Sequence, residues 1–177
     1  MAVVDKIVFI INGVAQSGKD SVVTLAKDYL YHKKIKVNNF SSIEPIKKIA
    51  KFLGWNGIDK DEKTRKFLSD IKQLSINYND FPFKYICKCI NEANNRSVNF
   101  IHCREVNEIK KIHNYFKNIL YIKTILVKRK VNIPNNYSDL NVNNFKYDIV
   151  INNNGDFDEL KKKTEMVIFQ QVWRIFK

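Results

Sequence analysis

The chain has 177 residues, of which 45% are hydrophobic and 12% aromatic, and its formal net charge is +13. This length is about that of one domain, and the hydrophobic fraction is sufficient for a packed core, which argues against a disordered chain. No segment approaches the roughly 20 apolar residues of a membrane-spanning helix. The first residues also lack the pattern of a signal peptide, so we expect a cytoplasmic protein without membrane contact.

Strand-length apolar segments alternate along the chain with longer amphipathic segments, a pattern typical of α/β folds. We expect strands at 6–11, 36–40, 97–103, 121–127 and 147–151. Helices are expected at 19–33, 45–53, 61–78, 83–94, 105–116 and 157–176. In the helix at 61–78 the apolar residues predicted to face inward are Phe67, Leu68, Ile71, Leu74 and Ile76. Apolar strands with helical crossovers indicate one doubly wound parallel sheet of five strands in a single domain over residues 1–177.

Charge and cysteine content favour no specialised class of protein. Lysines are scattered along the whole chain, so the excess positive charge has two interpretations: attraction to nucleotides or nucleic acid, or codon bias of an AT-rich genome. No motif for stacking nucleic-acid bases accompanies the charge. Cys87, Cys89 and Cys103 form neither a zinc pattern nor a disulfide framework, so we expect reduced, structural cysteines.

The strongest motif is a GxxxxGK loop formed by Gly13, Val14, Ala15, Gln16, Ser17, Gly18 and Lys19. It lies between a predicted strand and a predicted helix, which is the context that phosphate binding requires. The glycines allow successive N–H groups to turn toward a phosphate, and the helix directs its positive N-terminal end at the same anion. Lys19 adds a full charge for the terminal phosphates. The sequence therefore predicts a P-loop NTPase fold, a three-layer α/β/α sandwich, that binds ATP.

The residues after the lysine depart from the usual loop, in which a serine or threonine follows directly and ligates Mg²⁺. Here Asp20 follows Lys19, and the hydroxyl comes one position later, at Ser21. Asp20 is our candidate Mg²⁺ ligand, with Ser21 as a second candidate that could instead contact the α-phosphate. The alternative for Asp20 is that it only stabilises the first turn of the helix.

The spacing Gly-Lys-x-Ser resembles that of nucleoside monophosphate kinases, and Ser17–Ser21 is similar to the loop of phage-type deoxynucleoside monophosphate kinases. Residues 40–47 and 148–155 resemble two further segments of that family, and dephospho-coenzyme A kinases share part of the second. The resemblance implies transfer of the γ-phosphoryl group of ATP to the phosphate of a nucleotide.

Substrates of open α/β sheets bind beyond the carboxyl ends of the strands. The candidate acceptor-binding segment is 40–94, in which Ser41, Ser42, Lys47 and Arg65 are the predicted substrate-binding residues. Residues 128–146 form a candidate lid, within which 135–139 are hypothesised to contact the adenine or ribose.

The candidate catalytic residues are Lys19, Arg104 and Arg129. Each arginine follows a predicted strand, and its guanidinium can grip two phosphate oxygens together. Related kinases often carry an aspartate two residues before the arginine of the third strand, where this chain has His102. We leave three roles open for His102: a structural one, contact with a phosphate, and metal ligation. Glu105 is an alternative source of the missing carboxylate.

Two other functions remain open alongside nucleotide phosphorylation. The chain could phosphorylate another small metabolite, such as dephospho-coenzyme A, or act as a nucleotide-binding regulator that transfers no phosphate. The sequence also leaves open the base and sugar of the acceptor and whether the chain forms a homodimer.

Overall fold

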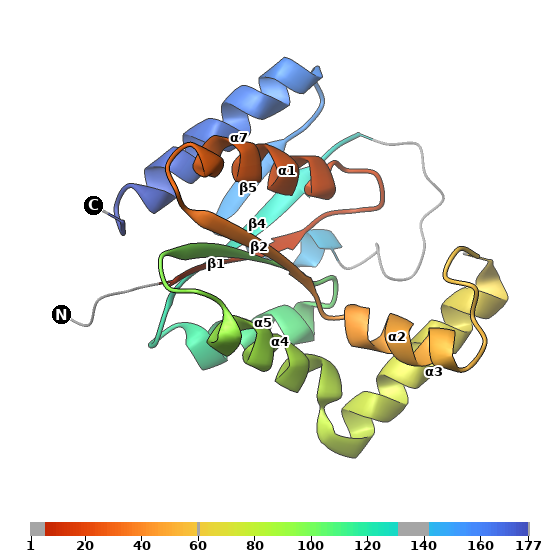
Figure 1. Ribbon diagram of the computed structural model, residues 1–177. Coiled ribbons are helices and arrows are strands. Elements are labelled where there is room, and N and C mark those ends of the chain that lie inside the picture. Colours follow the sequence, from red (N-terminus) through yellow and green to blue (C-terminus); the bar gives the residue numbers. More distant parts are fainter. Residues whose placement is uncertain (1–5, 60, 131–141, 177) are drawn as a thin grey trace. The chain divides into compact units, whose positions relative to one another are not determined.

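The structure is a computed structural model that describes residues 6–59, 61–130 and 142–176 (Figure 1). The chain divides into two compact units. Residues 1–39 and 93–177 form the first, which we call the sheet unit, and residues 40–92 form the second, which we call the helical unit.

Five strands form one parallel sheet in the order β2-β3-β1-β4-β5. Their bounds are β1 Lys6–Asn12, β2 Lys36–Ser41, β3 Ser97–His102, β4 Tyr121–Lys128 and β5 Ile149–Asn152. The central strand β1 pairs with β3 so that Ile11 lies opposite His102, and with β4 so that Asn12 lies opposite Leu126. This register brings the ends of β3 and β4 beside the residue from which the glycine-rich loop begins.

Helices cover both faces of the sheet and give the sheet unit three layers. The helices α1 (Lys19–Tyr31) and α7 (Phe157–Val172) lie on one face, and α5 (Val106–Phe116) lies on the other (Figure 1). Because side chains alternate along a strand, Ile7, Phe9 and Ile11 of β1 point to the first face, where they join the core formed with α1 and α7. The predicted three-layer α/β/α sandwich with a five-stranded parallel sheet is confirmed.

The helical unit contains α2 (Glu44–Phe52), α3 (Glu62–Asn79) and α4 (Phe81–Glu92). The Asp61 carboxylate caps α3 by accepting a hydrogen bond from the Thr64 amide at 2.7 Å, which satisfies one of the unpaired donors of the first turn. The prediction that Leu74 and Ile76 face inward is wrong, since they are 69% and 36% exposed.

The last strand and the last helix differ from the predicted bounds. The strand expected at 147–151 spans Ile149–Asn152 and follows a short 3-10 helix, Val142–Asn144. The helix expected to reach residue 176 ends at Val172. Among the described residues, no helix combines the length and apolar character needed to cross a membrane.

Candidate phosphate-binding site

The glycine-rich loop connects the carboxyl end of β1 to the start of α1 and has the backbone conformation that its glycines allow. Gly13 has a φ of 154° and Gly18 a φ of 98°, values that residues with a side chain rarely adopt. A Cβ at Gly13 would lie 2.4 Å from the Val127 carbonyl oxygen, and one at Gly18 would lie 2.4 Å from Asn153 Nδ2. Both positions therefore require glycine for space as well as for conformation.

Lys19 is the first residue of α1, and its ammonium folds back over the loop. Its Nζ donates hydrogen bonds to the carbonyl oxygens of Gly13 at 2.6 Å and Val14 at 2.8 Å. The side chain thus places a full positive charge beside the first loop residues, while the N-terminus of α1 adds its partial positive charge. The Ser17 side chain is fully buried, and its Oγ has no hydrogen-bond partner among the described residues.

Asn12, which sequence reasoning did not single out, connects the start of the loop to its surroundings. It is fully buried, and its Oδ1 accepts a hydrogen bond from the Gly13 amide at 2.8 Å. Its Nδ2 donates to the Arg104 carbonyl oxygen at 3.1 Å and to the Tyr147 hydroxyl at 2.8 Å. The signal in the sequence was an amide residue that ends an otherwise apolar strand directly before the first glycine of the loop.

Tyr147 completes this network, since its hydroxyl donates to the Val142 carbonyl oxygen at 3.0 Å. Burial raises the pKa of Tyr147 to about 12, against a smaller lowering by the hydrogen bond from Asn12. The phenol is therefore neutral at physiological pH and can donate and accept at the same time.

Asn153, also not singled out, supports the other end of the loop. Its buried side chain donates a hydrogen bond from Nδ2 to the Ser17 carbonyl oxygen at 2.8 Å. Its backbone N–H donates to the Lys128 carbonyl oxygen, also at 2.8 Å. It thereby joins the ends of β4 and β5 to the loop. No local pattern marks this role, because Asn153 is one of three consecutive asparagines.

The ends of the neighbouring strands bring further predicted residues toward the loop. His102 Nε2 lies 3.8 Å from Asp20 Oδ1, which is too long for a hydrogen bond but is an ion-pair distance when the imidazole is protonated. Arg104 and Arg129 follow β3 and β4, and both are exposed. The buried thiol of Cys103 lies 3.2 Å from Glu108 Oε2, and none of the three cysteines forms a disulfide.

The predicted Mg²⁺ ligands Asp20 and Ser21 lie in the first turn of α1. The Asp20 side chain is 93% exposed in the first turn of α1. No group of three or more potential metal-ligating His, Cys, Asp or Glu side chains occurs among the described residues. Mg²⁺ is commonly held by one or two carboxylates together with substrate phosphates and waters. One exposed carboxylate beside the loop is compatible with that mode of binding.

The other predicted site residues belong to the helical unit or fall outside the described ranges. Ser41 ends β2, Ser42 is buried before α2, Lys47 lies on α2, and Arg65 is exposed on α3. The acceptor segment predicted at 40–94 nearly coincides with the helical unit, residues 40–92. Residues 131–141 of the candidate lid lie outside the described residues. The residues predicted to contact the adenine or ribose, 135–139, therefore lie outside them as well.

Comparison with known proteins relates this fold to kinases. No protein-family model matches the sequence, and no curated protein matches it. Among solved structures, the APS kinase CysC of Mycobacterium tuberculosis in complex with AMPPNP and APS has a TM-score of 0.51 and 11% identity, over 94% of this chain and 98% of that chain. The chain shares the three-layer α/β/α fold of that kinase. The crystal structure of APE1195 is similar with a TM-score of 0.55 and 11% identity, over 98% of both chains.

Proposed function

We propose that this protein transfers the γ-phosphoryl group of ATP to a nucleoside or deoxynucleoside monophosphate. The observation that carries the proposal is the loop from Gly13 to Lys19, whose two glycines have left-handed conformations and whose lysine starts α1 beside the central strand. Such a loop presents backbone N–H groups, a helix N-terminus and an ammonium to one anion. A phosphate oxygen would also supply a hydrogen-bond partner for the buried Ser17 hydroxyl.

Phosphoryl transfer depends on alignment and charge neutralisation, with little covalent chemistry by the protein. Lys19 would bind the terminal phosphates, and Arg104 and Arg129 would stabilise charge on the transferring group. Asp20 and Ser21 would hold Mg²⁺, which neutralises phosphate charge when it is bound with the nucleotide. Backbone N–H groups of the loop would fix the phosphate chain, in the geometry that Asn12 and Asn153 maintain.

Acceptor binding is assigned in this proposal to Ser41, Ser42, Lys47 and Arg65. Hydroxyls suit the sugar or base of a nucleotide, and the two cations suit its phosphate. Arg65→Ala should then mainly raise the KM for the acceptor and leave the KM for ATP unchanged. Lys63→Ala, an exposed cation on the same helix, is the matched control and should change neither constant.

The test is ADP release from ATP and Mg²⁺ in the presence of each NMP and dNMP in turn, with Lys19→Ala as the inactive variant. Lys27→Ala removes an exposed lysine from the same helix and serves as the control. Release that depends on one monophosphate and disappears only in Lys19→Ala supports the proposal. APS, which the CysC structure contains, and dephospho-coenzyme A belong in the series of acceptors. Release with one of these alone would assign the protein to a different small-molecule kinase, and ATP binding without release would favour a regulator.

A further inference from the structure

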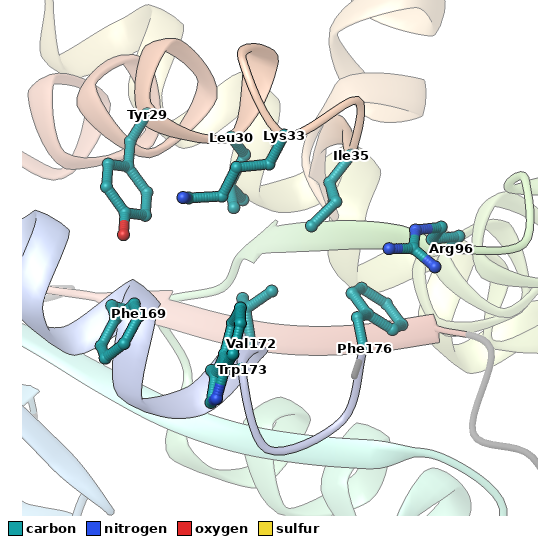
Figure 2. A pocket seen from close by; sticks show the side chains of 9 residues that line it. All are labelled: Tyr29, Leu30, Lys33, Ile35, Arg96, Phe169, Val172, Trp173 and Phe176. Carbon is teal, nitrogen blue, oxygen red and sulfur yellow. The ribbon is translucent and has the colours of Figure 1, made fainter.

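A cavity lies in the sheet unit at the end of the sheet opposite the glycine-rich loop. It has a volume of about 130 Å³ and is lined by side chains from the end of α1, from the turn before β3 and from the end of α7 (Figure 2). In a parallel sheet, the starts of β2 and β3 lie at the end opposite the carboxyl end of β1. A molecule bound here would therefore occupy a different site from the nucleotide.

Aromatic rings form much of the lining. Tyr29 comes from α1, Phe169 from α7, and Trp173 and Phe176 from the residues that follow it. Phe169 and Trp173 stack on each other, with ring centroids 5.8 Å apart and an interplanar angle of 22°. They remain 47% and 58% exposed. Exposed rings at the mouth of a cavity favour stacking with another ring.

Two cations accompany the rings, and no acidic residue lines the cavity among the described residues. Lys33 Nζ lies 4.9 Å from the centroid of the Tyr29 ring, and the guanidinium carbon of Arg96 lies 5.9 Å from that of Phe176. Neither cation forms an ion pair with a residue that the structure describes. In Figure 2, Lys33 extends into the cavity from its upper side and Arg96 from its right-hand end. Each cation thus makes a cation–π contact with a ring, and its charge remains available to an anion.

The backbone at Arg96 supports a functional reason for this arginine. Its φ is 53°, in the left-handed region that glycine or asparagine adopts more readily. Arg96 lies in the turn directly before β3, where a glycine would form the same turn without strain. Strained positions of this kind are concentrated at ligand-binding sites.

We propose that this cavity binds a small aromatic anion, a single planar ring that carries a carboxylate or a phosphate. A cavity of about 150 Å³ holds benzene in an engineered protein, so a volume of about 130 Å³ fits one ring but not a whole nucleotide. The ring packs between Tyr29 and the Phe169–Trp173 pair. The anionic group remains at the mouth, where Lys33 and Arg96 neutralise it.

The test uses the fluorescence of Trp173 in a Trp55→Phe background, since the chain has 2 tryptophans. Phenyl phosphate and benzoate are titrated alongside benzyl alcohol, which has the ring without the charge, and inorganic phosphate, which has the charge without the ring. At least one of the two aromatic anions should bind saturably and at least about tenfold more tightly than both controls. Whichever of the two binds more tightly identifies the anionic group.

Variants distinguish this site from the nucleotide site and from general adhesion. Arg96→Gly, which also relieves the backbone strain, and Lys33→Met should each weaken binding by about fivefold or more. Lys34→Met removes an exposed neighbouring charge that does not line the cavity and should leave binding unchanged. Binding should persist in Lys19→Ala, so the result is independent of the proposed kinase function. Equal binding of benzyl alcohol, no saturable binding of either aromatic anion, or affinities unaffected by Arg96→Gly and Lys33→Met would overturn the proposal.

Discussion

The replacement of Asn153 by alanine tests how the glycine-rich loop is supported. The substitution removes the hydrogen bond from Nδ2 to the Ser17 carbonyl oxygen, 2.8 Å long and buried. A buried acceptor left without its partner costs about 1–3 kcal/mol. We therefore expect Asn153→Ala to lower the free energy of unfolding by about 2 kcal/mol, which corresponds to a decrease of about 4–8 °C in Tm for a chain of this size.

Urea unfolding followed by circular dichroism measures this change, and Asn154→Ala is its matched control. The Asn154 side chain is exposed and accepts one hydrogen bond, from the Lys130 amide, so its loss should change stability by no more than about 0.5 kcal/mol. The ATP affinity of Asn153→Ala should also decrease, because the loop loses the contact that positions its carbonyl group. Equal stability and equal ATP affinity in the two variants would refute the supporting role of Asn153.

Three further predictions concern the loop and the pH dependence of stability. Gly13→Ala should abolish measurable ATP binding and destabilise the fold by about 1–3 kcal/mol, since the new Cβ would lie 2.4 Å from the Val127 carbonyl oxygen. Calorimetric titration measures the ATP binding, and thermal unfolding measures the stability. Burial acts to raise the pKa of Asp148, but hydrogen bonds from the Thr124 amide and hydroxyl, with the Lys123 ammonium, outweigh it and hold that pKa below its usual value. This stabilisation is present above a pH of about 3.9 and is lost as the pH falls through the lower folded pKa, so Asp148→Asn should reduce the acid-dependent loss of stability in urea titrations. The pKa of Tyr147 is raised to about 12 in the folded protein, so the stability that this residue contributes is present below a pH of about 10 and is lost as the pH rises toward 12. Tyr147→Phe should therefore reduce the loss of stability at alkaline pH. An unchanged alkaline stability profile in this variant would contradict the prediction.

The sequence was sufficient to predict the elements of the sheet unit because each carries a local signal. β1 is an uninterrupted apolar run from Ile7 to Ile11 that ends at a glycine loop, and such a run suits a strand buried on both faces. Lys19–Tyr31 has apolar residues at helical spacing, and five of them, Val22, Val23, Leu25, Ala26 and Leu30, are buried. The loop itself is recognisable because its glycines and its lysine have the spacing of a GxxxxGK motif.

What the sequence did not show depends on contacts between distant segments. Asn12 and Tyr147 are 135 residues apart, and Asn153 is 136 residues from Ser17, so neither pairing has a local pattern. The error at Leu74 and Ile76 has a different cause. Helical spacing identifies an apolar face, but the face is buried only as far as neighbouring elements cover it.

The transfer of a labelled γ-phosphate from ATP to a nucleoside or deoxynucleoside monophosphate tests the central claim most directly. The labelled product should be the corresponding diphosphate, and it should appear with the wild-type protein and with Lys27→Ala but not with Lys19→Ala. Label found only in inorganic phosphate, or retained in ATP when nucleotide binding is intact, would contradict phosphoryl transfer to a nucleotide.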